Sequence, residues 1–437
     1  MWRAWVATVV LVLVALPAVM GATSPGDGGG GDTVPGVTDD AVRVAFVTVD
    51  LTATQAALGF RTAPQGDPEA QVHALTDQVN ATGGIGGREL VPVVRRYEAL
   101  DDSPEAEQAL CDAITQDDEV FAVVLVGQFQ PNARPCYAGR DTLMLDATLV
   151  PQDTQAYEDL HPYLWSASFP SYDDWARSLV TSLVAADRVS GSRIGVVLAD
   201  TPTDHRVLDD VLAPSLQEGG AATVVPAPID TTDIGTLNVG LQQAIVTFRS
   251  QDVDQVLFLG GARLAPFFLT AASVQDFQSD LALTTFDNPE FIIKNPESVA
   301  QDSVPGSIGV GFQPGQDVFD DMLPVPFSDA EATCLDWLAE GGVTFPSRAE
   351  SRTAILYCDA VRLLQAGAEG LDEPDALDAG SWAASVQALG DRFQSGVAFR
   401  TYFDEGRWAG GSAVRVMAHD ATCNCFRYEG DDVVLAG

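Results

Sequence analysis

The chain has 437 residues, and its 62 acidic residues outnumber its 23 lysines and arginines, which gives a formal net charge of −39. A surface this acidic repels phosphate backbones and anionic membranes, so the composition argues against nucleic acid as a partner. The single lysine, Lys294, does not lie in a Gly-Lys-Ser/Thr triplet, which excludes a P-loop. The length predicts about two to three domains, and the 46% hydrophobic content allows each of them to bury a core.

The N-terminus predicts an exported protein. Residues 1–21 carry one charge, Arg3, before an apolar run from Ala4 to Met20, as in a secretory signal peptide that is cut before Ala22. An uncleaved membrane anchor is the alternative, although the run is barely long enough to span a bilayer. Residues 22–39 are rich in Gly, Pro and Asp and predict a flexible linker.

From residue 40 onward, short apolar runs alternate with helical patterns. Continuous apolar strands separated by helices predict parallel sheets that are covered on both faces. The expected strands are residues 42–47, 90–94, 121–127, 194–200, 223–225 and 256–261. The expected helices start at Pro104 after the N-cap Ser103 and at Tyr172 after the N-cap Ser171, cover about residues 204–218 and 238–248, and start again at Arg263.

Two consecutive blocks of this kind predict two doubly wound lobes. Helices then dominate residues 329–389, after which residues 399–403 and 414–417 predict a closing hairpin. This late return to strand suggests a chain that crosses between the lobes more than once.

Six cysteines, an even number, favour disulfide bonds formed in an oxidising compartment. A bridge within Cys423-Asn424-Cys425 needs a tight turn, because residues two apart in a straight strand cannot be joined. A metal site of His419, Cys423 and Cys425 is the alternative, and it offers only three ligands. We therefore expect three bridges between cysteines that are neighbours in the sequence: Cys111–Cys136, Cys334–Cys358 and Cys423–Cys425.

Catalytic and metal-binding motifs are missing from the sequence. It contains no His-Glu-x-x-His, no Gly-x-Ser-x-Gly and no Gly-x-Gly-x-x-Gly after a strand, and its four histidines have no metal-ligand spacing. The glycine cluster at residues 83–87 follows a helix and precedes a strand, so it predicts a helix stop and a turn. No metal or cofactor is expected.

Polar residues follow several of the predicted strands. In open α/β sheets, ligands bind outside the carboxyl ends of the strands, and two facing lobes bring two such edges together. Each of these side chains, taken alone, has an alternative role in capping the following helix. Together they predict a ligand groove with contributions from Gln128, Phe129, Gln130, Ala147, Thr148, Ser168 and Asp287.

Two stretches carry a resemblance to a known family. The segment Asn80 to Arg88 contains Asn-x-x-Gly-Gly-Ile-x-Gly-Arg, and Phe403 to Arg407 reads Phe-Asp-Glu-Gly-Arg. Their order along residues 40–430 resembles the periplasmic binding protein type 1 family, in the branch of leucine/isoleucine/valine-binding receptors of ABC transporters. The resemblance implies two Rossmann-like lobes joined by three crossovers with a ligand cleft between them.

The same resemblance implies lobe boundaries and site residues. Lobe 1 is expected to comprise residues 40–167 and 313–392, and lobe 2 residues 168–312 and 393–437. Gln128 and Gln130 replace the hydroxyl side chains that hold a ligand carboxylate in the family, and Asp287 falls near the acid that receives a ligand ammonium. Ala262 stands where the family often has an aromatic residue, and Arg263 beside it could instead face an anionic group.

The function that the resemblance implies is that of an exported solute receptor. We expect a monomer that binds an amino acid or an amide-like solute and passes it to an ABC permease in the membrane, without enzymatic activity. Ala22 occupies the position of the lipid-modified cysteine of tethered relatives, so no lipid anchor is expected. Two alternatives are the ligand-binding ectodomain of a sensor and an exported hydrolase.

Overall fold

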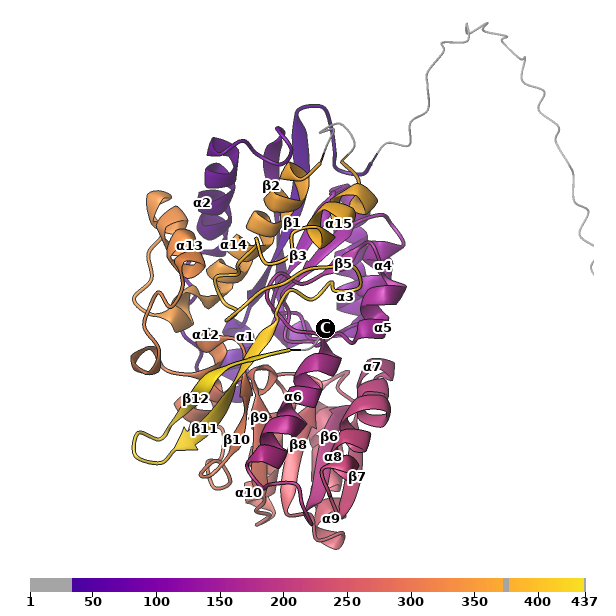
Figure 1. Cartoon of the computed structure of the whole chain (residues 1–437), viewed down its shortest axis with the longest axis vertical. Helices are drawn as coiled ribbons and strands as arrows, with labels where there is room; N and C mark the ends of the chain where they lie inside the picture. Colours follow the sequence, from indigo (N-terminus) through magenta and orange to yellow (C-terminus); the bar gives the residue numbers. More distant parts are fainter. Residues whose placement is uncertain (1–33, 372–376, 436–437) are drawn as a thin grey trace, which may run out of the picture. The chain divides into compact units, whose positions relative to one another are not determined.

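The computed structural model describes residues 34–371 and 377–435. The predicted signal peptide and most of the predicted linker lie outside these ranges. The described chain forms two sheets with helices on their faces, one in each of two lobes (Figure 1). Within these ranges no helix is long and apolar enough to cross a membrane.

The sheet of the first lobe has five parallel strands in the order β2-β1-β3-β4-β5. Every residue of β3 and β4 is buried, as their continuous apolar sequences predict for a sheet that is covered on both faces. Pro92 lies in β2, an edge strand, where the missing backbone N–H costs least. The strands are β1 (Ala41–Asp50), β2 (Glu89–Glu98), β3 (Ala122–Leu125), β4 (Leu143–Asp146) and β5 (Leu164–Trp165).

Helices from two distant parts of the sequence cover this sheet. The long, largely buried helix α14 (Arg348–Glu369) packs against α2, α13 and α15. The predicted N-cap Ser103 is confirmed, because its side chain accepts a hydrogen bond from the backbone of Ala106. The other elements are α1 (Thr52–Leu58), α2 (Pro68–Ala81), η1 (Ala99–Asp101), α3 (Pro104–Asp112), η2 (Ala113–Asp117), α4 (Arg134–Ala138), α5 (Thr154–Asp159), α13 (Asp329–Glu340) and α15 (Ala379–Gln387).

The sheet of the second lobe has the strand order β12-β11-β10-β9-β8-β6-β7. Five neighbouring strands of this sheet are parallel: β10, β9, β8, β6 and β7. Next to β10, β11 and β12 add an antiparallel hairpin. The strands are β6 (Arg193–Ala199), β7 (Thr223–Ile229), β8 (Gln255–Leu259), β9 (Asp280–Thr284), β10 (Ile308–Gly311), β11 (Ala413–Asp420) and β12 (Cys425–Val434).

The helices of this part of the chain begin with α6, whose predicted N-cap Ser171 accepts a hydrogen bond from the backbone of Asp174. The predicted helix over residues 204–218 is continuous but contains a π-helical turn, η3. The elements are α6 (Tyr172–Ala185), α7 (Pro202–Arg206), η3 (Val207–Leu212), α8 (Ala213–Glu218), α9 (Ile234–Ser250), α10 (Leu264–Val274), η4 (Thr285–Asp287), α11 (Pro289–Lys294), α12 (Pro314–Asp317) and η5 (Asp320–Met322).

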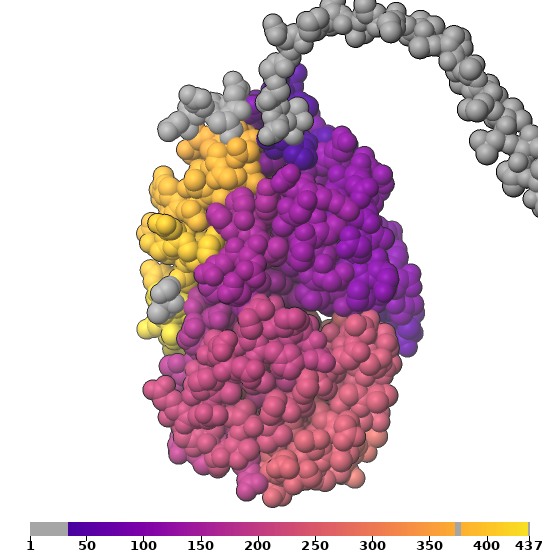
Figure 2. Space-filling model, turned by 90° about the vertical axis from the view of Figure 1, so that its right-hand side faces the viewer, coloured from indigo at the N-terminus to yellow at the C-terminus, as the bar shows by residue number. Residues whose placement is uncertain are grey.

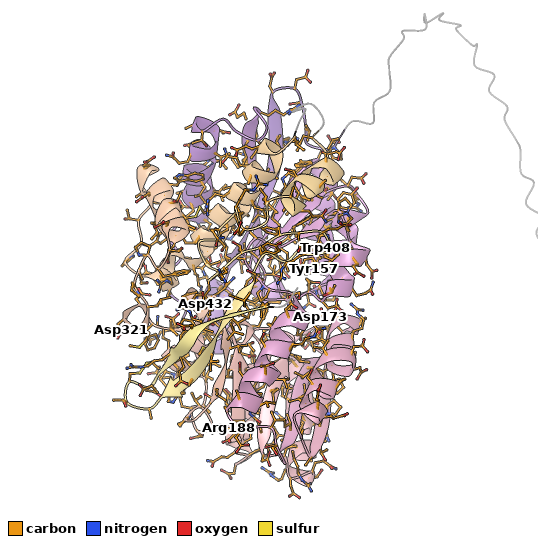
Figure 3. All side chains as sticks on the ribbon, in the orientation of Figure 1. Tyr157, Asp173, Arg188, Asp321, Trp408 and Asp432 are labelled. Carbon is orange, nitrogen blue, oxygen red and sulfur yellow. A yellow bond between two sulfur atoms is a disulfide. The ribbon has the colours of Figure 1, made fainter. Side chains whose placement is uncertain are left out.

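The chain crosses between the two lobes three times: between β5 and α6, between β10 and α13, and between α15 and β11. At the last crossing, the ring of Trp408 stacks on Tyr157 with 6.3 Å between ring centroids (Figure 3). Ser166 and Ala409 also pair as a parallel bridge, so the first and last crossings run side by side. The lobe boundaries at residues 167/168, 312/313 and 392/393 remain a prediction.

The predicted closing hairpin was wrong in one of its strands. Residues 399–403 form isolated bridges, of Thr401 with Gly411 and of Phe403 with Gly390, and the partner of β11 is β12. The sequence Gly430-Asp431-Asp432 inside β12 is typical of a turn, and for this reason the strand was not predicted. The glycine cluster after α2 is a helix stop as predicted: Gly84 has a φ of 69°, and a Cβ there would lie 1.9 Å from the carbonyl oxygen of Arg88.

All three predicted disulfide bonds are present in the structure. Cys111–Cys136 joins α3 to α4, and Cys334–Cys358 joins α13 to α14. Cys423–Cys425 closes the turn between β11 and β12, where Asn424 has a φ of 49°. That left-handed residue provides the tight turn that the sequence required of this pair.

Replacing both Cys334 and Cys358 by alanine should lower the free energy of unfolding by about 3 kcal/mol on the loop-entropy model. Their separation of 24 residues makes the unfolded chain much less restricted once the bridge is lost. The matched change at Cys423 and Cys425, two residues apart, should cost about half as much. Urea unfolding followed by circular dichroism measures both, and equal losses would contradict the prediction.

Candidate functional site

A cavity of ≈ 1140 Å³ has walls from both lobes. The first lobe contributes the residues that follow β1, β3 and β4, the helices α1 and α14, and the loop of residues 59–67. The second lobe contributes α9, α10 and residues 288–299. The space-filling view shows a hollow where the violet and pink parts of the chain meet (Figure 2). The cavity therefore lies at the carboxyl ends of parallel strands, where α/β folds place their ligands.

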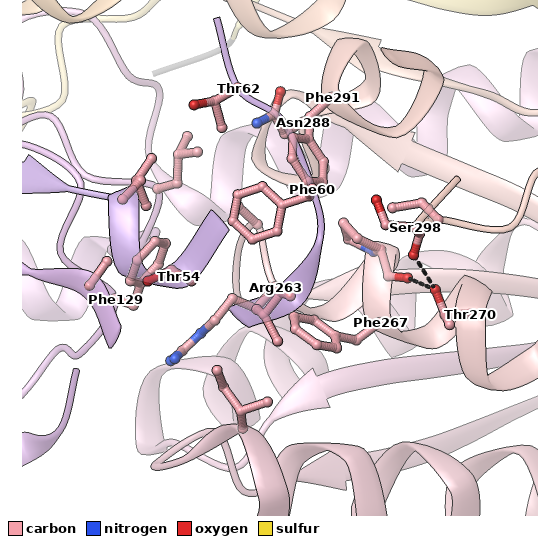
Figure 4. Close-up of a pocket in the computed structure, with 18 of the residues that line it drawn as sticks. Thr54, Phe60, Thr62, Phe129, Arg263, Phe267, Thr270, Asn288, Phe291 and Ser298 are labelled. Atoms are coloured by element: carbon pink, nitrogen blue, oxygen red, sulfur yellow. Dashed lines mark hydrogen bonds between the residues drawn. The ribbon is translucent and has the colours of Figure 1, made fainter. Parts of the chain in front are cut away.

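The loop of residues 59–67 reaches from the first lobe to α11 in the second. The rings of Phe60 and Phe291 meet edge to face, with 5.3 Å between their centroids. The backbone N–H of Arg61 donates to Oδ1 of Asn295 at 2.6 Å, and Nδ2 of Asn295 donates to the carbonyl of Arg61 at 2.9 Å. Because Phe60 and Phe291 both line the cavity, these contacts close one of its walls (Figure 4).

Most of the cavity lining is apolar, with four phenylalanine rings. They are Phe60 and Phe129 from the first lobe and Phe267 and Phe291 from the second, and they surround the open space in Figure 4. Two buried polar atoms on residues of the same walls have no hydrogen-bond partner in the described part of the chain: Oγ1 of Thr54 and Oδ1 of Asn288, on residues 7% and 8% exposed. A buried polar group without a partner is unusual, so these two atoms are candidates to bind a ligand.

Arg263 lines the cavity and bridges the two lobes. Its guanidinium donates to Asp102 at 2.8 Å in the first lobe and to the carbonyl of Thr231 at 3.0 Å in the second. Gln130 donates to the same Asp102 carboxylate at 2.7 Å. The guanidinium also lies over the ring of Phe129, 5.0 Å from its centroid. The charge of Arg263 is therefore already neutralised by the protein.

Arg352, on α14, is the second arginine of the lining, and its side chain is less well paired. Its guanidinium donates one hydrogen bond, to Oε1 of Gln316 at 3.4 Å. Burial lowers the pKa of Arg352, and the negative charge of Glu290 opposes this effect. Glu290 itself is bound by Lys294 at 2.6 Å.

The predicted site residues divide into two groups. Phe129, Ala147 and Arg263 line the cavity. The others lie outside the lining, and their side chains are buried or bonded within the protein: Gln128 without a partner, Gln130 on Asp102, Thr148 between Arg134 and Asp146, Ser168 near Gln313, and Asp287 on Thr284. Their part in ligand binding remains a prediction.

Asp287 does not face the cavity, although the resemblance implied that it receives an ammonium group. Its carboxylate accepts the backbone N–H of Thr284 at 2.7 Å and the hydroxyl of Thr284 at 3.0 Å, so it caps η4. The residue is 1% exposed, and burial raises the pKa of Asp287 to about 7, with the Thr284 hydrogen bonds opposing the shift. The next residue, Asn288, is the one that turns toward the cavity.

Arg352 and the loop of residues 59–67 were missed as site residues. Arg352 lies in the second turn of the long helix α14, and no strand ends directly before it. The signal that could have found it is a charged residue among the buried positions of an amphipathic helix. Nothing in the local sequence of residues 59–67 indicates that this loop reaches the other lobe.

The family profile described as "Periplasmic binding protein" matches residues 61–297, more than half of the chain. The chain belongs to this family. No curated protein matches the sequence.

Solved structures with the same fold come from several bacteria. A branched chain amino acid ABC transporter protein from Thermus thermophilus with bound valine is 12% identical, with a TM-score of 0.61 over 92% of this chain and 98% of that one. A solute binding protein from R. palustris in complex with 4-hydroxybenzoate is 14% identical, with a TM-score of 0.61 over 91% and 98%. A fatty acid ABC transporter substrate-binding protein from Thermomonospora curvata is 15% identical, with a TM-score of 0.60 over 92% and 94%. At such identities the likeness shows the fold alone.

The buried carboxyl of Asp287 predicts a dependence of stability on pH. Its pKa is about 7 in the folded protein, against an ordinary value of 3.8, so between these values only the folded state holds the proton. Stability should therefore fall as the pH rises from 5 to 8. In Asp287→Asn this contribution is absent, and the melting temperature should fall less over that range.

The exposed Asp209 provides the control, since Asp209→Asn removes the same charge at the surface. Calorimetry at pH 5, 6.5 and 8 gives the change of melting temperature with pH for the wild-type protein, Asp287→Asn and Asp209→Asn. Asp317 is also buried, and its pKa is also raised to about 7, so part of the slope should persist in Asp287→Asn. If the melting temperature of Asp287→Asn depended on pH as strongly as that of the wild-type protein, the raised pKa of Asp287 would be contradicted.

Proposed function

We propose that this chain is the exported receptor of an ABC importer, which binds a small solute between its lobes and presents it to a membrane permease. The observation that carries the proposal is the cavity whose walls come from both lobes in a chain of the periplasmic binding protein family. A ligand that contacts both lobes stabilises the closed arrangement over the open one, and a permease can distinguish the two.

Contacts between the lobes support closure as the mechanism. Besides the Asp102–Arg263 pair, Arg206 of the second lobe holds Asp153 of the first through two hydrogen bonds of 2.6 and 2.9 Å. Asp153 is only 3% exposed, whereas the side chain of Arg206 is 37% exposed, so the acid of this pair is buried and the arginine is partly open to solvent. Each of these two ion pairs can break when the lobes separate and form again when they close, which suits a receptor that opens and closes.

The resemblance predicted an amino acid or an amide-like solute. The structures of the same fold are described with valine, with 4-hydroxybenzoate and as a fatty acid transporter protein, so the fold accommodates several chemistries. The solute class of this chain therefore has to come from its own cavity lining.

Thermal unfolding of the full chain with a panel of amino acids, amides, carboxylic acids and sugars tests the binding function. A ligand at a hundred times its Kd adds about 2.7 kcal/mol, which raises the melting temperature by several degrees. Deletion of the gene should also abolish uptake of the stabilising solute by the cells. Binding without any loss of uptake would favour a sensor, and no stabilisation by any solute would contradict the receptor.

A substitution at Gly261 tests whether the lobes must close to bind the solute. Gly261 follows β8 with a φ of 90°, and a Cβ there would lie 2.2 Å from the carbonyl oxygen of Leu149 in the other lobe. Gly261→Ala should therefore hold the lobes apart, increase the radius of gyration in X-ray scattering, and weaken solute binding about tenfold or more.

Gly191 is the matched control for backbone strain. It has a φ of 77° in an exposed turn of the same lobe, and a Cβ there would meet nothing within 4 Å. Gly191→Ala carries a similar conformational cost without the clash, so its radius of gyration should match the wild-type value. Equal scattering curves for both variants would show that Gly261 does not limit closure.

A further inference from the structure

The cavity lining is positively charged in a strongly acidic protein. The chain has 62 acidic residues, yet no aspartate or glutamate lies among the described residues of the lining, which includes Arg263 and Arg352. A ligand ammonium group would find no counter-charge on these walls, and burying an unpaired charge is costly. The lining therefore disfavours a zwitterionic amino acid and favours an anion.

Of the two arginines, Arg352 is the one left for a ligand. Arg263 is held by Asp102 at 2.8 Å. The two most buried arginines of the described chain are likewise paired, Arg134 with Asp146 at 2.6 Å and Arg348 with Glu331 at 2.9 Å. Arg352 has instead a neutral partner at 3.4 Å, Gln316.

The negative charge that acts on Arg352, that of Glu290, is hydrogen-bonded elsewhere. Glu290 acts on Arg352 through its charge, but its carboxylate is hydrogen-bonded by Lys294 at 2.6 Å. A guanidinium stays protonated in proteins and presents five N–H donors in one plane. Most of these donors have no acceptor among residues 34–371 and 377–435, and a carboxylate would accept from two of them at once.

The rest of the lining fits an extended apolar body. Besides the four phenylalanine rings, the lining includes Val239, Val246 and Val274 on α9 and α10, which are 68%, 51% and 82% exposed. Their apolar side chains are open to solvent along one continuous cavity. The volume of ≈ 1140 Å³ also exceeds the ~300–1,000 Å³ of ordinary small-molecule pockets.

We propose that the cavity binds a carboxylic acid with an extended apolar body, whose carboxylate pairs with Arg352. The proposal rests on the receptor function and names the solute class of the same cavity. Thr54 and Asn288, whose oxygens lack partners, provide polar contacts beside the apolar chain, and Asn288 can also donate through its amide nitrogen.

Calorimetric titration of the full chain with matched ligands tests the proposal. The ligands are octanoate and dodecanoate, the aromatic acid phenylacetate, the neutral octanamide, and leucine. Wild-type protein should bind octanoate at least tenfold more tightly than octanamide, and leucine weakly or not at all. Dodecanoate tighter than octanoate indicates an aliphatic solute, and phenylacetate tightest of all indicates an aromatic one.

The variant Arg352→Gln removes the charge and keeps a hydrogen-bonding side chain. It should lose the preference for octanoate over octanamide, a change of tenfold or more, while its affinity for octanamide stays within about twofold. The control Arg400→Gln changes the charge by the same amount at an exposed position outside the lining and should keep the preference. Circular dichroism and the melting temperature without ligand establish that both variants are folded.

The failures of the two proposals are distinguishable. Tight binding of leucine or another amino acid, with none of the acids, would overturn the solute class and leave the receptor function standing. An unchanged preference for octanoate in Arg352→Gln would overturn the role of this residue. No binding of any of these five ligands to the folded wild-type protein would overturn the solute class, and the wider panel of solutes then decides the receptor function.

Discussion

The carboxylate of Asp102 couples the two lobes and sets the charge of the cavity. It is bound by the hydroxyl of Tyr97 at 2.5 Å, by the amide of Gln130 at 2.7 Å and by the guanidinium of Arg263 at 2.8 Å. With a side chain only 3% exposed, Asp102 cannot exchange these partners for water while the lobes are closed. It therefore neutralises one arginine of the cavity and leaves Arg352 as the cation open to a ligand.

A chain this rich in acidic residues has to keep their carboxylates away from an anion site. The buried acids near the strand ends do so by bonding to other groups of the protein. Asp146 binds Arg134 and Thr148, Asp287 caps η4, and Asp317 accepts hydrogen bonds from Thr285 and Tyr428. Short side chains beside a backbone turn satisfy its N–H groups more readily than they reach a ligand.

The sequence predicted the fold in considerable detail. The alternation of apolar strands and helices, the caps Ser103 and Ser171, the helix stop at Gly84 and the three disulfide bonds are all present. Each of these features depends on neighbours in the sequence or on a strong spacing pattern. The strand β12 was missed because Gly430-Asp431-Asp432 has the local signature of a turn, which pairing with β11 overrides.

The candidate site was less predictable, because its residues come from both lobes and from segments far apart. Phe129 and Ala147 were found from their places after strands and Arg263 from the family resemblance, and all three line the cavity. By itself, the sequence determined a two-lobed α/β chain with its polar residues at strand ends. Only the tertiary structure decided which arginine is neutralised: Arg263 pairs with Asp102 across 161 residues of sequence, whereas Arg352 forms no ion pair with an acid among the described residues. Ion pairing depends on distances of a few ångströms, and long-range packing alone sets them.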